Sequence, residues 1–591
     1  MVKLDWLGDL QRLFMSRDDG YLKKGVSAEQ RYLEICQTIE RICSENGHIQ
    51  SKEYTTKGIS ERFQEYISNN LTSFSSPVLA NFGTDRGLPI SCNHSEIPDT
   101  MEGIMGGVHD MCLLAKNGAG TAYNFSKIRP IGAEISTGGK SSGIMPWIEL
   151  YAKAINNTTQ SSIRRGFLTA YLSVDHPEIM DFLEIGTDKY SPIPEEVMIQ
   201  LKSMGMDVKM VDKIKSIMQS ITTAVTLPKG FRKKLMDGDK YSRKIWAKIL
   251  KNRAEIGYPY ILDEENCNRG LCQAYQDKDM WVYNGNICAE AIEYVDEEKD
   301  FACCLSSVNL VHKDRFKDYP YFYIDHFVML DCVISEYVEK GSKIKGLEKA
   351  VRFAKEHRAI GLGTMGLHTY FQSKMIPFGS IESQAINVEI FKEMRSQGEI
   401  ATKLMARAWG EPEILKGYDR RNTSLLAQAP TKSTAYLMGR GDISQGVQPI
   451  SSNYHEIKRA KIQDTFKNPH LKRVLESYNK DDNTTWISIL ENNGSVQHLS
   501  FLSENEKNVF KCFREISQMD IISMAGARQK YIDMGQSINL SIHPDTPPKE
   551  INKLHLAAFN DHGLKSLYYQ YSVNAAQEYN QSLMECSSCE G

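Results

Sequence analysis

No apolar stretch in the sequence approaches the length of a membrane-spanning helix. Residues 1–6 also lack the apolar core of a secretory signal peptide. Neither sign of charge prevails, because 71 basic and 74 acidic residues leave a formal net charge of -3, so there is no general attraction to nucleic acids or anionic membranes. We therefore expect a cytoplasmic protein with no membrane span and no direct nucleic-acid binding, in which any phosphate site is local.

A disulfide framework is also missing. Thirteen cysteines is an odd number, and in a reducing compartment most of them should be thiols. The terminal pair, Cys586 and Cys589, has no second C-x-x-C with which to complete a four-ligand zinc site. A dithiol on a polar tail is typical of electron exchange with a partner protein, while half of a zinc site is the alternative.

Internal repeats and low-complexity tracts are absent, and the 591 residues are enough for several domain-sized cores. Residues 1–70 carry apolar side chains at helical spacing, which predicts a helical layer. Across residues 75–570, strand-like and helix-like segments alternate, which predicts a barrel-like α/β core. Residues 192–221 indicate an inserted helical segment of unassigned function, and residues 574–591 indicate a mobile polar tail.

The stretch from Asn284 to Glu290 places an amide, a thiol and a carboxylate at alternate positions, Asn286, Cys288 and Glu290. In an extended chain, alternate positions project from the same face. The three groups could then line one pocket and offer a hydrogen-bonding amide, a sulfur for redox or radical chemistry, and a base. A lone cysteine is more often a small buried hydrophobe, so this stretch by itself does not decide between the two interpretations.

Two further stretches suit phosphate groups. Residues 429–435 combine hydroxyls with Lys432 after a proline at the start of a helix-like run, and such donors suit an anion at a helix N-terminus. They do not form a P-loop, because the spacing G-x-x-x-x-G-K-[ST] is absent. Arg164 and Arg165, in a polar loop, are either a solvated face or a contact to phosphate or base.

Six short motifs occur in one order along the chain. They are Ser91-Cys92, Asn-x-Cys-x-Glu from Asn286, Cys-Leu-Ser-x-x-Asn-Leu from Cys304 (a register that selects Cys304 over Cys303), Pro-Thr-x-Ser-Thr from Pro430, Leu-Tyr-Tyr at 567–569, and the terminal cysteine pair. In this order they resemble the large, catalytic subunit of class I ribonucleotide reductases, over most of the chain from Ser76 to Cys589. Residues 491–499 are similar to reductases of large tailed bacteriophages.

The resemblance implies a ten-stranded α/β barrel of two five-stranded parallel halves, with Cys288 on a loop threaded through its centre. It implies an N-terminal helical region at 1–70, the catalytic barrel at 71–573 and a redox tail at 574–591. Family members often begin with an ATP-binding cone that switches overall activity. Here the helical layer starts almost at Met1, so we expect no cone and no inhibition by dATP through one.

The resemblance also implies a reaction, the reduction of ribonucleoside diphosphates to 2′-deoxyribonucleoside diphosphates, the precursors of DNA. Cys288 would become a thiyl radical and abstract the 3′ hydrogen, while Glu290 takes the 3′-hydroxyl proton and Asn286 hydrogen-bonds the substrate. Cys92 would protonate the leaving 2′-hydroxyl and, with Cys304, supply two electrons and end as a disulfide. The tail thiols would reduce this disulfide and then be reduced by thioredoxin or glutaredoxin.

Tyr568 and Tyr569 would otherwise be a packing pair, but by the same resemblance they carry the radical in from a separate small subunit with a dimetal cofactor. The chain itself would hold no metal and no permanent cofactor. The substrate would contact Ser76, Ser91, Gly120, Asn286, Glu290, Thr431, Lys432, Ser433 and Thr434. Deoxynucleoside triphosphate or ATP effectors, with Mg²⁺, would bind at a homodimer interface through Asp99, Arg129, Ile135 and Arg164.

Two alternatives stay open at this point. A cobalamin-dependent reductase of the same barrel class would share the cysteines but would need neither a tyrosine relay nor a small subunit, and the Tyr568-Tyr569 pair argues against it. A non-enzymatic nucleotide-binding or zinc-tail protein would use Cys288 only as a core residue. Stoichiometric zinc would support that second alternative.

Overall fold

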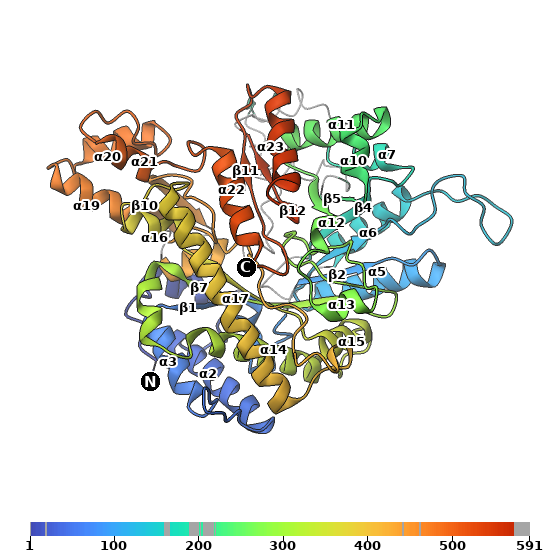
Figure 1. Cartoon of the computed structure of the whole chain (residues 1–591), viewed down its shortest axis with the longest axis horizontal. Helices are drawn as coiled ribbons and strands as arrows, with labels where there is room; N and C mark the ends of the chain where they lie inside the picture. Colours follow the sequence, from blue (N-terminus) through green and yellow to red (C-terminus); the bar gives the residue numbers. More distant parts are fainter. Residues whose placement is uncertain are drawn as a thin grey trace.

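The computed structural model describes residues 2–17, 20–90, 92–158, 166–187, 189, 200, 203–204, 218, 220–439, 442–459 and 462–572. Strands lie at the centre of the molecule and helices surround them (Figure 1). Most of the segment 192–221 and all of the tail at 574–591 lie outside the described residues. The expectations for these two segments therefore stay predictions, as does the division into three regions.

Five parallel strands form the first half of the central sheet. In sheet order they are β2 (Cys92–Glu96), β3 (Gly120–Asn124), β4 (Leu168–Ser173), β5 (Thr222–Leu227) and β6 (Tyr260–Asp263). Parallel neighbours need crossover connections. Helices supply them here, namely α5 (Met101–Lys116), α6 (Met145–Asn157), α10 (Phe231–Met236) and α11 (Lys240–Ile256). The strands are buried along nearly their whole length, as strands covered on both faces are.

The second half is built from shorter extended segments. Strand β7 (Phe301–Asn309) pairs in parallel with β8 (Ile360–Met365). Parallel bridges continue from β8 to residue 426 and from residue 428 to residue 536. The half ends with β11 (Leu540–Ser541) in parallel with β13 (Gln570–Tyr571). The two halves meet through antiparallel pairs, β2 with β7 and β6 with β12 (Ser566–Leu567). This arrangement confirms the predicted α/β barrel of two parallel halves.

The predicted N-terminal helices are present as α1 (Asp9–Ser16), α2 (Ala28–Glu45) and α3 (Ile59–Ser68). Helix α2 begins at a capping box in which Ser27 and Gln30 exchange side-chain and backbone hydrogen bonds. Its apolar stripe, including Ile35 and Ile39, is fully buried. These helices share one hydrophobic core with α14 (Phe322–Gly341) and the barrel. The helical layer is thus packed on the barrel.

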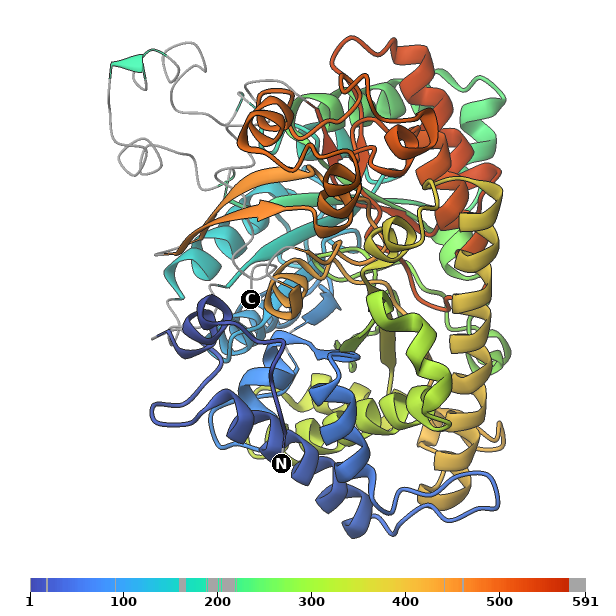
Figure 2. The same cartoon turned by 90° about the vertical axis from the view of Figure 1, so that its left-hand side faces the viewer.

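The other elements complete the shell. The helix α17 (Ile381–Trp409) runs along the outside of the molecule (Figure 2). An outer unit contains the hairpin of β9 (Tyr454–Arg459) and β10 (Ile462–Lys467) with α19 (Pro469–Ser477), α20 (Asn483–Glu491) and α21 (Glu504–Val509). The remaining elements are β1 (Thr72–Phe74), α4 (Ser76–Asn81), α7 (Ile179–Phe182), α12 (Glu264–Cys267), α13 (Gln273–Asp277), η3 (Leu310–Asp318), α15 (Glu348–His357), α16 (Leu367–Ser373), η4 (Glu413–Leu415), α18 (Lys432–Gly439), α22 (Gln518–Gln529) and α23 (Pro548–Asn560).

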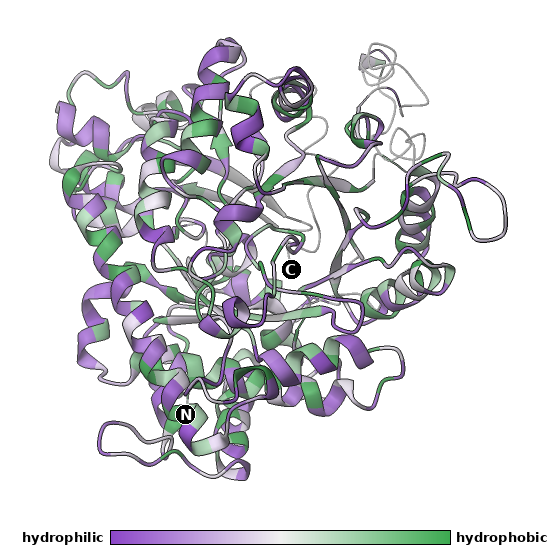
Figure 3. Cartoon of the chain, turned by 45° about the vertical axis from the view of Figure 1, so that its right-hand side comes forward, coloured by the Kyte–Doolittle hydropathy of each residue, from purple (hydrophilic) through white to green (hydrophobic). Residues whose placement is uncertain are grey.

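Hydrophilic and hydrophobic residues alternate along the peripheral helices (Figure 3), as expected for helices with one face on the core. Within the described part of the chain, no helix combines the length and the apolar character that a bilayer crossing requires.

Candidate active site

Cys288 lies on a turn and not on an extended strand. The backbone N–H of Ala289 donates to the Asn286 carbonyl (3.2 Å), and Ala289 has a left-handed φ of 59°. The prediction that alternate positions share a face of extended chain was therefore wrong. The amide and the carboxylate still meet, because Asn286 Nδ2 donates to Glu290 Oε1 (3.0 Å) and Asn286 Oδ1 accepts from the Glu290 N–H (3.1 Å). The asparagine side chain ties the two ends of the turn together.

Four backbone carbonyls of this turn accept hydrogen bonds from residues distant in the sequence. From donor to acceptor, the bonds are Tyr171 Oη to Asn286 (2.7 Å), Ser537 Oγ to Cys288 (2.7 Å), Ser566 Oγ to Ala289 (2.6 Å) and the Gly535 N–H to Glu290 (2.7 Å). A buried carbonyl without a partner is costly, so these bonds fix the turn in place. Gly535 must approach closely, since a Cβ there would lie 3.0 Å from the Ala289 oxygen.

The Cys288 thiol sits among tyrosines. Its residue is only 6% exposed and belongs to a hydrophobic cluster with Tyr260 and Tyr568, with Tyr569 packed against it. The rings of Tyr568 and Tyr569 lie 4.4 Å apart between centroids, and those of Tyr260 and Tyr568 lie 4.5 Å apart. The structure thus brings the predicted tyrosine pair and the predicted redox cysteine into one cluster.

Cys92 begins strand β2 at the seam between the two halves of the barrel. Its Cα has two neighbours across the sheet, Gly120 on β3 and Cys303 on β7. Cys304 is the next residue along β7, and successive strand residues point to opposite faces. Cys304 is buried in the main core, where burial and then the Asp331 carboxylate raise the pKa of its thiol well above the ordinary value. The strand register therefore favours Cys303 over the predicted Cys304 as the neighbour of Cys92.

The predicted phosphate contacts lie at the start of α18. The Thr431 hydroxyl accepts from the Gly446 N–H (2.7 Å). Ser433 Oγ is buried and has no hydrogen-bond partner among the described residues. A buried hydroxyl left without a partner at a helix N-terminus is suited to an anionic ligand. A small cavity beside this region is lined by Pro430 and Gly446 and also by Ser537, whose hydroxyl donates to the Cys288 carbonyl.

Ser76 is the first residue of α4 and is buried, with its Oγ 3.1 Å from the Tyr21 hydroxyl. It follows directly on β1, which packs against α18. Ser76 therefore lies on a chain segment close to α18, and its contact to substrate stays a prediction. Ser91 lies outside the described residues.

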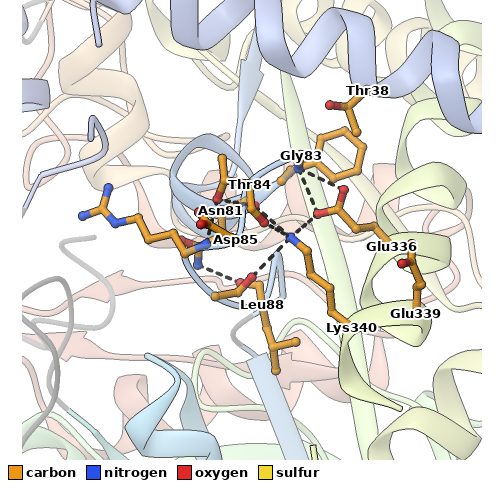
Figure 4. A network of polar contacts seen from close by, with 12 residues as sticks. Thr38, Asn81, Gly83, Thr84, Asp85, Leu88, Glu336, Glu339 and Lys340 are labelled. Atoms are coloured by element: carbon orange, nitrogen blue, oxygen red, sulfur yellow. Dashed lines mark hydrogen bonds and ion pairs between the residues drawn. The ribbon is translucent and has the colours of Figure 1, made fainter. Parts of the chain in front are cut away.

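The chain between α4 and β2 is clamped to α14 (Figure 4). Lys340 Nζ donates to the carbonyls of Asn81 (3.2 Å) and Thr84 (2.5 Å) and to Glu336 Oε1 (2.5 Å). Both Glu336 carboxylate oxygens accept from the Gly83 N–H at 2.9 Å. Because α4 carries one predicted substrate contact and β2 carries Cys92, this clamp sets the spacing between them.

Replacing Lys340 with methionine should lower the free energy of unfolding by about 2–4 kcal/mol, because it strips the buried Glu336 carboxylate of its closest cation. A matched control is Lys343→Met on the same helix, which breaks an exposed pair with Glu339 (3.0 Å) and should cost no more than about 0.5 kcal/mol. Urea unfolding of both variants measures the difference. Equal midpoints would show that the clamp is not structural.

Three of the predicted effector contacts come together beside α5. Arg129 Nε donates to Asp99 Oδ2 (2.6 Å), and Arg129 also donates to the carbonyl of Glu134 (2.8 Å), the residue before Ile135. Arg164, like the tail cysteines Cys586 and Cys589, lies outside the described residues. The side chains of Arg129 and Asp99 are 36% and 29% exposed, so both can reach a bound ligand.

Sequence patterns missed the residues that hold the turn. Tyr171 lies within a buried strand, where its hydroxyl gives no signal. Ser537 and Ser566 belong to short extended segments without a motif for hydroxyl donors. Only the three-dimensional pairing of the second barrel half shows that they reach Cys288 and Ala289.

Comparison with known proteins agrees with this geometry. A family model described as "Ribonucleotide reductase, barrel domain" matches residues 90–420 and 406–570. The chain is 31% identical to the ribonucleoside-diphosphate reductase large subunit of Invertebrate iridescent virus 3, over 96% of this chain and 93% of that protein. It is 31% identical to the putative ribonucleoside-diphosphate reductase large subunit of Frog virus 3, over 90% of this chain and 93% of that protein. Among solved structures it is similar to the class Id ribonucleotide reductase alpha subunit of Actinobacillus ureae. The TM-score is 0.83 and the sequence identity 36%, and the match covers 98% of this chain and 99% of that one.

Proposed function

The chain belongs to the ribonucleotide reductase large-subunit family, and from that premise we propose that it reduces ribonucleoside diphosphates to 2′-deoxyribonucleoside diphosphates together with a small subunit. One observation carries the proposal. Cys288 is held on a fixed turn, with the Glu290 carboxylate on one side and the Tyr568 ring in the same cluster. A thiol, a base and an aromatic path are thus assembled at one point inside the barrel.

In the proposed reaction, the Cys288 thiyl radical takes the 3′ hydrogen of the ribose and returns it after the 2′ carbon has been reduced. Glu290 accepts the 3′-hydroxyl proton, and Asn286, which already donates to Glu290, orients the substrate. The 2′-hydroxyl leaves as water. Two thiols supply the two electrons and close to a disulfide, which balances the loss of the hydroxyl.

We propose Cys92 and Cys303 as these two thiols. Directly opposed residues of an antiparallel pair have Cα atoms about 4.5–5.5 Å apart, which overlaps the separation that disulfides need. Cys92 would also protonate the leaving 2′-hydroxyl. The tail pair Cys586 and Cys589 would reduce the disulfide by thiol exchange and would itself be reduced by thioredoxin or glutaredoxin, in the reducing cytoplasm.

The radical enters, in this proposal, through Tyr569 and Tyr568 from the metal cofactor of the small subunit, so this chain holds no resident cofactor. A cavity of about 670 Å³ between α11 and α23 is lined by apolar side chains, including Leu250, Ile551 and Leu556. The residue after α11, Gly257, accepts a hydrogen bond from the Gln570 N–H, next to the tyrosine pair. We propose that the small subunit docks on this face.

Met236→Glu tests that docking face. Met236 lines the cavity, is 57% exposed and can be charged without disturbing the core. Burying a new carboxylate in the interface should weaken small-subunit binding by at least about tenfold. Ile487→Glu, at a similarly exposed position on α20, is the control and should bind normally. Equal affinities of the two variants, measured by calorimetry, would place the docking face elsewhere.

The substrate diphosphate is proposed to bind Thr431, Lys432, Ser433 and Thr434 at the start of α18, together with Ser76, Ser91 and Gly120. Specificity effectors, deoxynucleoside triphosphates or ATP with Mg²⁺, are proposed to bind at Asp99, Arg129, Ile135 and Arg164. Large apolar side chains are exposed beside this second site, namely Met101, Met105 and Ile131. A second copy of the chain would cover them, which supports the proposed homodimer.

The decisive experiment is the conversion of CDP to dCDP by the purified chain, with and without its small subunit and with thioredoxin as reductant. We expect product only when both subunits are present. Turnover with adenosylcobalamin and no second protein would instead assign the cobalamin-dependent class. No product under either condition would refute the proposed activity.

A further inference from the structure

The Ser537 hydroxyl makes two contacts but has one hydrogen to give. Ser537 Oγ lies 2.7 Å from the Cys288 carbonyl oxygen and 3.0 Å from Glu290 Oε2. A carbonyl oxygen only accepts hydrogen bonds, whereas a carboxyl group accepts when ionised and donates when protonated. The protonation state of Glu290 therefore decides which way the hydroxyl points.

Two arrangements follow. When Glu290 is ionised, the hydroxyl donates to the carboxylate, because a charge-assisted hydrogen bond is stronger than a neutral one. The Cys288 carbonyl then loses this donor. When Glu290 is protonated, its acid O–H donates to Ser537 Oγ, and the hydroxyl is free to donate to the Cys288 carbonyl. In the structure the shorter of the two contacts is the one to the carbonyl.

We propose that Ser537 is a positioning residue that couples proton uptake by Glu290 to the hydrogen bond on the Cys288 carbonyl. The inference rests on the proposed function, in which Glu290 receives the 3′-hydroxyl proton. Ser537 neither gains nor loses a proton in the cycle, since its hydroxyl only rotates. The turn that carries the thiol is held most firmly while Glu290 is protonated and loosens when the proton returns to the substrate.

Several other groups of the described residues lie around Glu290. On its own turn it faces the Asn286 amide and the Cys288 thiol. From β4 it faces the Tyr171 phenol. The pKa of this phenol is raised well above the ordinary value, first by burial, then by Glu290 and then by Cys288. Glu293, three residues along, instead accepts from Thr423 (3.4 Å).

From the side of α22, a buried cation contacts the extended segment that carries Ser537. Arg528 Nε donates to Gln536 Oε1 at 2.6 Å, and Gln536 is the residue before Ser537. Arg528 and Ser537 also line the same cavity. The arginine thus helps to hold the segment that presents the Ser537 hydroxyl.

The test compares the pH dependence of kcat/KM for CDP in the complete two-subunit enzyme. Ser537→Ala removes a donor from the Glu290 carboxylate, so the acidic limb of the profile should move to higher pH by roughly 0.5–1 unit. Ser537→Thr keeps a hydroxyl and should return the limb toward the wild-type position. Ser566→Ala is the matched control, because it removes a hydroxyl bond from the adjacent Ala289 carbonyl. It should lower kcat without moving the limb.

Should Ser537→Ala fail to fold, Ser537→Cys keeps the size, weakens the donor and should shift the limb in the same direction. An unmoved acidic limb in active Ser537→Ala, or in active Ser537→Cys where the alanine variant does not fold, overturns the inference alone. A wild-type enzyme without reductase activity overturns both the proposed function and the inference. The same shift of the acidic limb in Ser566→Ala would show that Ser537 has only a structural role, and this result would also overturn the inference.

Discussion

Cys288→Ser should lose nucleotide reduction by on the order of 10⁴-fold or more, as enzymes do when the atom that makes and breaks bonds is removed. A serine hydroxyl holds its hydrogen more strongly than a thiol does, so it cannot be converted to a radical by a tyrosine. The change is nearly isosteric in a residue that is 6% exposed. Folding should therefore be preserved, and substrate should still bind.

The measurement is dCDP formation with the small subunit present, next to thermal unfolding of the same preparation. Tyr568→Phe keeps the ring in its cluster with Tyr260 but removes the O–H, and it should be equally inactive. Cys512→Ser is the matched control, because Cys512 is another buried thiol, in the outer unit, that donates to the Gly494 carbonyl. It should retain activity. Substantial turnover by Cys288→Ser would mean that this thiol is only a core residue.

Cys303→Ser and Cys304→Ser should behave in opposite ways, although the residues are neighbours. Cys303 stands opposite Cys92 across the seam, so its loss leaves no partner for the disulfide and should reduce turnover by on the order of 10³-fold or more. Cys304 is 1% exposed in the core. A hydroxyl there should lower the free energy of unfolding by about 1–3 kcal/mol and leave the chemistry intact.

Turnover without an external reductant, followed by mass spectrometry of the digested protein, identifies the bond directly. We expect a Cys92–Cys303 link in the wild type. A Cys92–Cys304 link, or an active Cys303→Ser beside an inactive Cys304→Ser, would restore the assignment made from the motif register. Cys36→Ser, at a fully buried core thiol on α2, controls for nonspecific effects of losing a sulfur.

The sequence predicted the N-terminal helices well, because their signals are local. Tyr32, Ile35 and Ile39 recur at helical spacing in α2 and are all buried in the structure. The second barrel half is harder to find. Its strands β11, β12 and β13 are only two residues long, and pairing partners far away in the chain define them. Local periodicity cannot show such short segments.

The sequence named candidate residues for the site but did not show their backbone geometry. The roles of Asn286, Cys288 and Glu290 stay predictions. The backbone between them turns through Ala289, which has a positive φ although it is not a glycine, so no sequence signal marks the turn. The choice between Cys303 and Cys304 also needs the pairing of β7 with β2, because motif letters do not show which face a strand residue occupies. Both points depend on the course of the backbone and not on the chemistry of the side chains.

The four bonds on the turn also determine when, during synthesis, the thiol becomes part of a working site. The partners of Asn286, Cys288 and Ala289 lie 115, 249 and 277 residues away along the chain, two of them towards its C-terminal end. Contacts of such long separation form late in folding. A nascent or truncated chain that ends before residue 535 can fold its first barrel half but cannot hold Cys288 in place. Such a chain would lack the fixed turn on which the proposed chemistry of Cys288 depends.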